Sequence, residues 1–202
     1  MKKVIPVIML LLFLVAWYLI WYVYSGLKFI PPHFHANFAM YIEGERVDFS
    51  DDKYMEDIAA CGIGGVIYPS HRAHLHENNG ETIHIHHEWV SFGHFFSNIW
   101  FSFGENYIVN DESKIYQEAA WDQVTFILNW KIVENPFNRL IKSEDRLLIS
   151  YGSESEEVLL ERYSSVSNNA GEYNAKYDPG SCWGNNENGI VVLIHQMFDH
   201  KH

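Results

Sequence analysis

Apolar and polar residues alternate along several stretches of the chain, which is the pattern of β-strands with one buried face. In residues 33–49 four apolar side chains share one parity and three polar side chains share the other, and Glu43-Gly44-Glu45 is typical of a turn. The stretch therefore predicts a β-hairpin with a polar edge. Its apolar set is Phe34, Phe38, Met40 and Ile42, and its polar set is His33, His35 and Asn37.

A second hairpin is predicted in residues 71–94, where the pairs His74/His76 and His84/His86 flank a turn-like segment. Strand side chains alternate between faces, so each His-x-His pair lies on a single face. A two-residue Asn79-Gly80 turn would put the two pairs on opposite faces. A three-residue turn, 78–80 with Gly80 in the left-handed conformation, places His74 opposite His84. We predict the three-residue turn, with all four imidazoles on one face.

The remaining pattern predicts short elements joined by turns. These are an amphipathic helix over 91–100, an exposed insertion over 101–123, strands at 124–130, 131–133 and 146–151, a helix opened by the capping box Ser153-x-x-Glu156, and a buried strand at 189–198. The predicted fold class is α+β, predominantly antiparallel β-hairpins with one or two short helices, plus one N-terminal transmembrane helix. The predicted domains are an anchor at 1–26, a His-rich hairpin module at 27–110 and a small β-grasp-like module at 111–202.

The N-terminal run is the reason for the predicted anchor. Lys2 and Lys3 precede 21 uncharged residues from Val4 to Tyr24, and aromatic residues crowd the second half of the run. About 20 apolar residues cross the hydrocarbon core of a bilayer, and aromatic side chains favour its interface. A cleaved signal peptide is the alternative, although no small-residue cleavage site follows. We predict an uncleaved signal anchor in the cell membrane, with the C-terminal domain extracytoplasmic and the lipid bilayer as a partner.

Charge limits the partners of the rest of the chain. Without Lys2 and Lys3, 12 basic residues face 26 acidic residues, a net charge of −14. So acidic a domain does not favour nucleic acid or anionic lipid heads as partners.

The chain has only two cysteines, Cys61 and Cys182, and they form no Cys-x-x-Cys motif. A thioredoxin-type redox role is therefore not indicated. In an oxidising compartment two cysteines predict a disulfide. The alternative keeps Cys61 as a metal ligand beside the histidines.

The histidines predict a metal site. Neutral imidazole is a common ligand of copper and zinc, whereas four protonated imidazoles on one face would repel each other. The predicted ligands are His74, His76, His84 and His86, with His35 and His33 as further donors from a neighbouring strand. The alternative for each pair is a polar strand face that uses histidine only for solubility.

Three classes of function fit this pattern. The first is a metal-binding protein for copper or zinc, which handles or delivers the ion at the membrane surface. The second is a zinc or copper enzyme with Glu77, Glu81 or Glu88 as the base, although the chain has no His-Glu-x-x-His motif. The third is a structural or interaction subunit of an envelope membrane complex, with other membrane proteins as partners. The pattern favours the first class and assigns no catalytic residue.

The block HLHENNGETIHIH, followed by Ser91-Phe-Gly-His-Phe-Phe, resembles the His-x-His block of uncharacterised, membrane-anchored, His-rich extracytoplasmic proteins of bacteria and archaea. The resemblance extends to the hairpin HFHANFAMYIEGERV and to the segments 145–152 and 178–182. Many members have an acid where this chain has His86. The resemblance implies an anchored, extracytoplasmic, metal-binding module, and it carries no established activity.

Overall fold

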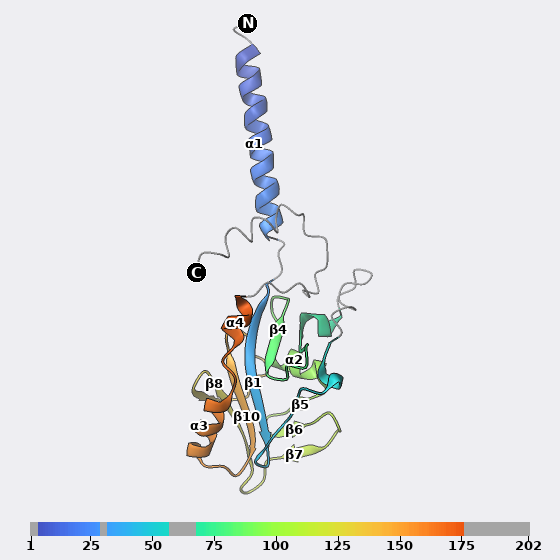
Figure 1. Cartoon of the computed structure of the whole chain (residues 1–202), viewed down its shortest axis with the longest axis vertical. Helices are drawn as coiled ribbons and strands as arrows, with labels where there is room; N and C mark the ends of the chain where they lie inside the picture. The colour runs from blue at the N-terminus through green and yellow to red at the C-terminus, as the bar shows by residue number, and fades with distance from the viewer. Residues whose placement is uncertain (1–3, 29–31, 57–67, 176–202) are drawn as a thin grey trace. The chain divides into compact units, whose positions relative to one another are not determined.

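The computed structural model describes residues 4–28, 32–56 and 68–175. The chain divides into two compact units, residues 1–31 with 185–202, and residues 32–184. Each unit is considered by itself (Figure 1).

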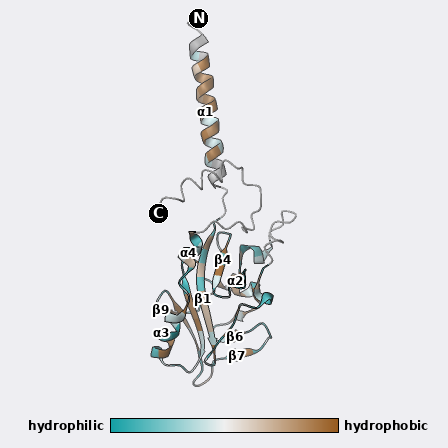
Figure 2. Cartoon of the chain, viewed as in Figure 1, coloured by the Kyte–Doolittle hydropathy of each residue, from teal (hydrophilic) through white to brown (hydrophobic). Residues whose placement is uncertain are grey.

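In the first unit, the described part is helix α1 (Val4–Lys28), which covers the apolar run. Figure 2 shows apolar residues along most of its length. Within the described part of the chain, however, no helix is both long and apolar enough to cross a membrane. This finding differs from the transmembrane helix that the run predicts.

The second unit is built on a mixed sheet that is antiparallel except at its centre. Its strands follow the order β3-β4-β1-β10-β8-β9, with β2 paired to β1, and only the pair β1–β10 is parallel among the described strands. The strands are β1 (Phe34–Ile42), β2 (Glu45–Arg46), β3 (Ala73–His74), β4 (Thr82–Ile85), β8 (Gln123–Leu128), β9 (Lys131–Val133) and β10 (Arg146–Gly152). The predicted α+β class with antiparallel hairpins is confirmed.

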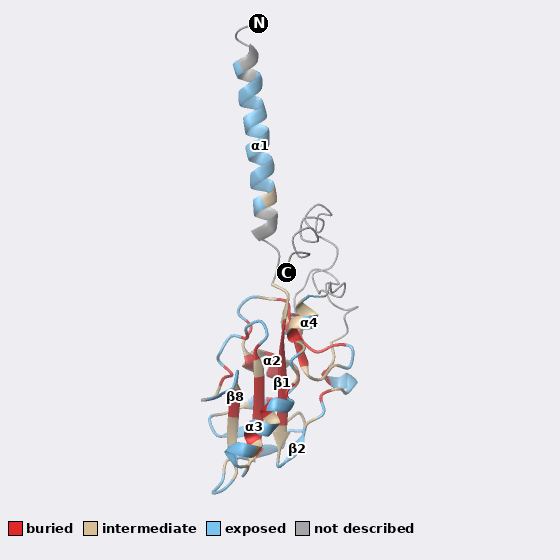
Figure 3. Cartoon of the chain, turned by 60° about the vertical axis from the view of Figure 1, so that its left-hand side comes forward, coloured by how far each residue is buried: buried red, intermediate tan, exposed pale blue. Residues whose placement is uncertain are grey.

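Strand β1 lies inside this sheet, between β4 and β10, and is buried along most of its length (Figure 3). Its even-numbered residues Ala36, Phe38 and Met40 are fully buried in the larger hydrophobic core. Its odd-numbered residues face the other side, where Ala39 packs in a smaller core with residues of α3 (Glu156–Ser165). The predicted parity of this hairpin is confirmed, as is its turn, where Glu43 and Gly44 have φ values of 52° and 93°.

Helices cover the two faces of the sheet. On one side lies α2 (Phe92–Asn98), which matches the predicted amphipathic helix and buries Phe92, Phe95 and Phe96. On the other lie α3 and α4 (Ala170–Asn174). Two 3-10 helices, η1 (Asp52–Tyr54) and η4 (Pro69–Arg72), lie in the connections.

The start of α3 corrects the predicted capping box. The N-cap is Ser155 and not Ser153, because the chain is still extended at Ser155 and turns helical at Glu156. The hydroxyl of Ser155 accepts a hydrogen bond from the backbone N–H of Val158 at 3.4 Å. A cap must immediately precede the first helical residue to reach these N–H groups.

Residues 101–123, predicted to be an exposed insertion, instead form a three-stranded sheet of β5 (Ser102–Phe103), β6 (Tyr107–Val109) and β7 (Ile115–Gln117). Ile108 is fully buried in the larger core, and Tyr116 packs against that core. Apart from Phe101 and Ile108, residues of this range are exposed or half-buried, so the predicted exposure is confirmed in part. The sheet was missed because strands of two or three residues are too short for their alternation to be recognised.

One sheet takes strands from both ranges that were predicted as modules, since β1 to β4 lie in 27–110 and β8 to β10 in 111–202. Cys61, Cys182 and the predicted strand at 189–198 lie outside the described residues. The disulfide therefore stays a prediction.

Candidate metal centre

Three neighbouring strands bring the predicted histidines to one face of the sheet. In the register, His84 of β4 lies between His35 of β1 and His74 of β3. The prediction that His74 is opposite His84 is thus confirmed. On the same three segments, His33 lies two positions before His35, and His76 and His86 lie two positions after His74 and His84. Five of the six histidines (His35, His74, His76, His84 and His86) are between 1% and 5% exposed, and His33 is half-buried.

The turn that joins β3 to β4 differs from the predicted one. Glu77 and Asn78 adopt left-handed φ values of 58° and 55°, and Asn79 N–H donates to the carbonyl of His76 at 3.1 Å. Two successive left-handed residues are the geometry of a type I′ turn. Gly80 is not left-handed. It is needed because a Cβ there would lie 2.5 Å from the backbone carbon of Phe49. The loop nevertheless keeps the parity that puts both His-x-His pairs on one face.

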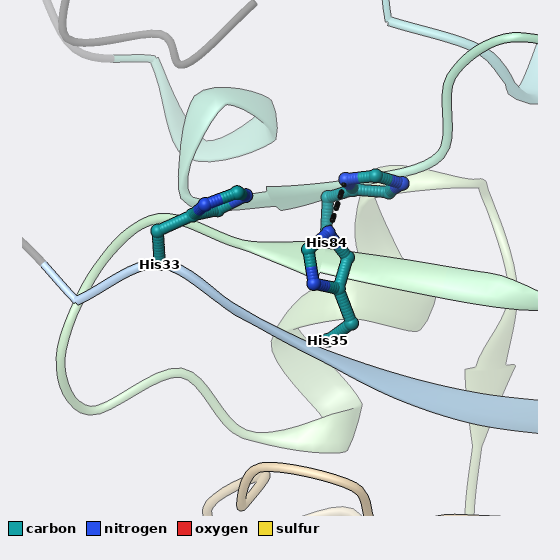
Figure 4. A group of neighbouring side chains, drawn as sticks. All are labelled: His33, His35 and His84. Carbon is teal, nitrogen blue, oxygen red and sulfur yellow. Dashed lines mark hydrogen bonds between the residues drawn. The ribbon is translucent and has the colours of Figure 1, made fainter. Parts of the chain in front are cut away.

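The closest contacts within the cluster converge on Nδ1 of His84. This atom lies 2.9 Å from Nε2 of His35 and 2.7 Å from Nε2 of His76. One ring nitrogen from each of His33, His35 and His84 also lies within 4.8 Å of the others (Figure 4). On an ion with tetrahedral geometry and bonds of about 2.0–2.1 Å, donor atoms are about 3.3 Å apart. Small side-chain shifts would therefore bring these nitrogen atoms to the separations that one ion requires.

Asn174, the last residue of α4, sets which nitrogen of His35 carries the proton. The backbone N–H of His35 donates to Oδ1 of Asn174 at 2.8 Å, so that atom is the amide oxygen. Nδ1 of His35 lies 2.8 Å from the same oxygen and must therefore be the protonated nitrogen. The lone pair is then on Nε2, which faces His84. Metal-binding histidines are commonly oriented by such an acceptor on the opposite ring nitrogen.

His74 is held in a similar way, because its Nδ1 lies 3.1 Å from the backbone carbonyl of Ser70 in η4. That carbonyl can only accept, so Nδ1 is the donor and the lone pair is on Nε2. In two of the six histidines, His35 and His74, the surrounding backbone and side chains thus select the tautomer with Nε2 available for a metal.

Electrostatics keep the centre of the cluster neutral. Burial lowers the pKa of His84 far below its ordinary value, and the neighbouring imidazoles of His76, His35, His74 and His86 lower the pKa further, in that order. Burial disfavours the charged ring, and like charges add to this effect. A neutral imidazole is the form that binds a metal.

The other histidines of the cluster form a stack of rings. The ring of His86 lies between those of His33 and His74, with centroid distances of 4.7 and 5.0 Å and interplanar angles of 11° and 18°. The ring centroid of His33 is also 4.8 Å from that of His35. The pair His33/His35, whose role the sequence left open, is therefore part of the cluster and not an exposed strand face.

Helix α4 covers the cluster and is fixed by buried polar residues beside it. Asn37, fully buried on β1, donates to Oδ1 of Asn169 at 2.8 Å and accepts from the N–H of Ala170 at 3.0 Å. Thr82, also fully buried, donates to the same Asn169 oxygen at 3.1 Å. Tyr173 of α4 packs against the rings of His35 and His84, with centroid distances of 5.5 and 5.9 Å.

Sequence reasoning missed α4, Tyr173 and Asn174, because it predicts no helix or strand between the capped helix and the strand at 189–198. The parity of Asn37, which matches that of the β1 histidines, was the one available signal of a polar partner on this face.

The remaining candidates lie outside the cluster. His71 is near Glu56, with 3.5 Å between Nε2 and the carboxylate, and His94 Nε2 is 3.1 Å from the carbonyl of Pro69. Among the suggested bases, Glu81 pairs with Arg46 at 2.7 Å, and Glu88 is exposed. Glu77 reaches the edge of the cluster, since its carboxylate is 4.0 Å from Nδ1 of His76.

Comparison of the chain with protein families, with curated proteins and with solved structures finds no match. The resemblance to the His-rich membrane-anchored proteins therefore stays an expectation from the residues alone.

Proposed function

We propose that this protein binds a transition metal ion, copper or zinc, through the histidine cluster. The observation that carries the proposal is the convergence of ring nitrogens from His33, His35 and His84 within 4.8 Å of one another, with His76 2.7 Å from His84. His35 and His84 are the central ligands, and His33 and His76 are the neighbouring donors.

The donor set indicates the class of ion. Imidazole suits copper and zinc, whereas calcium and magnesium prefer carboxylate and carbonyl oxygens. Within the described residues, the donors that converge here are imidazole nitrogens, and Glu77 stays largely exposed at the edge. Calcium and magnesium are therefore poor candidates for this site.

Binding, storage or delivery of the ion is the role that these features favour. A hydrolytic zinc site keeps one position open for water beside three protein ligands. Here ring nitrogens of His33, His35 and His84 converge, His76 lies 2.7 Å from His84, and the rings of His74 and His86 are neighbours. So many imidazoles favour a closed coordination shell.

One observation favours a metal-dependent enzyme as a second candidate. A cavity of about 510 Å³ is lined by Glu77 and Tyr173, which adjoin the cluster, and by none of its six histidines. A small substrate in this cavity would lie near the ion, with Glu77 as the base. Turnover of ester and phosphoester substrates by the zinc-loaded protein, and its loss in Glu77→Gln, would support this candidate.

The location of the protein is a separate part of the proposal. The uncharged run after Lys2 and Lys3 supports an extracytoplasmic domain held at the cell membrane. Protease protection in intact cells and spheroplasts tests it: digestion of the domain only after lysis would contradict an extracytoplasmic position.

Calorimetric titration with Cu²⁺ and Zn²⁺ tests the metal site. The full-length chain should carry no affinity tag, and His200→Ala/His202→Ala removes adventitious chelation by the C-terminal tail. In this background we expect tight binding, which His35→Gln/His84→Gln weakens at least 100-fold. The matched control is His94→Gln, which removes a partly exposed histidine outside the cluster and should leave binding unchanged. Equal binding by the cluster variant and the control would refute the proposal.

A further inference from the structure

The cluster contains more imidazoles than one ion can use. A tetrahedral ion takes four ligands, and cuprous ions often take three or fewer. Six histidines nevertheless share one face of three adjacent segments, and each ring centroid lies within 5.0 Å of at least one other. They are His33, His35, His74, His76, His84 and His86. The surplus indicates a second place for an ion.

The shortest nitrogen–nitrogen contacts and the ring stack distinguish two groups of three rings, which adjoin where the ring centroid of His33 lies 4.8 Å from that of His35. In the first group, Nε2 of His35 and Nε2 of His76 both point at Nδ1 of His84, at 2.9 and 2.7 Å. The second group is the stack of His33, His86 and His74, whose adjacent centroids are 4.7 and 5.0 Å apart.

The spacing of the second group suits a metal ion. Two imidazoles on one tetrahedral ion, with bonds of about 2.0–2.1 Å, have ring centroids about 5 Å apart. The adjacent rings of the stack already have this separation, whereas His33 and His74 lie on opposite sides of His86. The outer two side chains would have to turn about their Cα–Cβ and Cβ–Cγ bonds, so that their lone pairs meet that of His86 at one point.

The low charge of the ligands favours cuprous ions over divalent ions in this cluster. All six ligands are neutral, and the carboxylate of Glu77 lies at the edge with its side chain 74% exposed. Two divalent ions would bring four positive charges into this buried cluster, whereas two cuprous ions bring two. Buried charge without a compensating anion is strongly unfavourable.

We infer that the cluster holds two cuprous ions, one bound by His35, His76 and His84 and the other by His33, His74 and His86. This inference rests on the proposed function and adds the stoichiometry, the oxidation state and the ligand groups. His33, which neighbours both His35 and His86, belongs to the second group when both ions are bound.

Native mass spectrometry after anaerobic loading tests the inference. The full-length chain in the His200→Ala/His202→Ala background is treated with iodoacetamide to block any free thiol. It is then loaded with cuprous ion, kept reduced by ascorbate, against a competing chelator. We expect two ions per chain with copper and at most one with zinc. One cuprous ion per chain, or none with zinc still bound, would overturn this inference and leave the proposed function intact. Binding of neither cuprous ion nor zinc would overturn both.

Variants test the division into groups. His74→Gln/His86→Gln should bind one cuprous ion, because the group around His84 is intact. The control His94→Gln should bind two. Loss of both ions in a His74→Gln/His86→Gln chain with the far-UV circular dichroism of the wild type would overturn the assignment of ligands.

Discussion

Asn174 should control metal affinity although its side chain is not a ligand. Its Oδ1 accepts two hydrogen bonds from His35, one from the backbone N–H and one from ring Nδ1, both at 2.8 Å. Asn174→Ala removes the acceptor, so that His35 can protonate on Nε2 instead and lose its metal-facing lone pair. Loss of such an orienting partner typically weakens metal binding 10- to 100-fold, about 1.4–2.7 kcal/mol.

The same substitution should also lower the folding stability of the metal-free protein. Each hydrogen bond contributes about 0.5–1.5 kcal/mol, and the two are only partly buried, so the metal-free variant should lose about 1–3 kcal/mol and stay folded. Competition against a chelator of known affinity measures the metal affinity, and urea unfolding of the metal-free protein measures the stability separately.

Asn174→Asp is the matched control, because its carboxylate keeps an acceptor oxygen at the same place. It should bind metal at least as tightly as the wild type, since the added negative charge also favours a cation. The reasoning is refuted if Asn174→Ala binds metal as tightly as the wild type, or if Asn174→Asp loses as much affinity as Asn174→Ala.

Three further outcomes are expected. Because the pKa of His84 is low in the folded chain, the unfolded chain binds an additional proton below about pH 6.5. The metal-free protein should therefore lose about 1.4 kcal/mol of stability per pH unit as the pH falls below this value. An unchanged melting temperature between pH 8 and pH 5 would contradict this prediction. Asn37→Ala removes the buried hydrogen bonds of this side chain, including those that fix α4, and should lower the free energy of unfolding by about 2–4 kcal/mol. Urea titration measures this change, and a loss below about 1 kcal/mol would show that these hydrogen bonds are weak. Gly80→Ala should destabilise the fold by about 1–3 kcal/mol, because its Cβ would overlap the Phe49 backbone. Gly171→Ala is the control that should melt near the wild-type temperature, because its Cβ would lie 3.4 Å from the flexible side chain of Glu144.

Local pattern was sufficient for the parts of the fold that depend on neighbouring residues. Alternation predicted the β1–β2 hairpin and the pairing of His74 with His84, and both are present. It did so because a strand with one buried face tolerates only registers that keep its parity. The predicted turn between the two His-x-His pairs was wrong although the predicted register was right, because several types of turn can join two strands and keep the same parity.

Short or irregular segments were not predictable in this way. The strands β5 to β7 span two or three residues each, and α4 spans five, so none of them repeats its pattern often enough to be recognised. Their structure comes from contacts with the rest of the fold, such as those of Ile108 with the core and of Asn169 with Asn37.

The sequence by itself determined which histidines share a face, because side-chain direction along a strand is a local property with a period of two. The tertiary structure decided which strands lie side by side. It placed His35 opposite His84, 49 positions away, and brought Asn174 to His35 across 139 positions. Such contacts depend on the packing of the whole core and leave no periodic signal in the chain. The ligand types could thus be read from the sequence, whereas their number, spacing and tautomers follow from the fold.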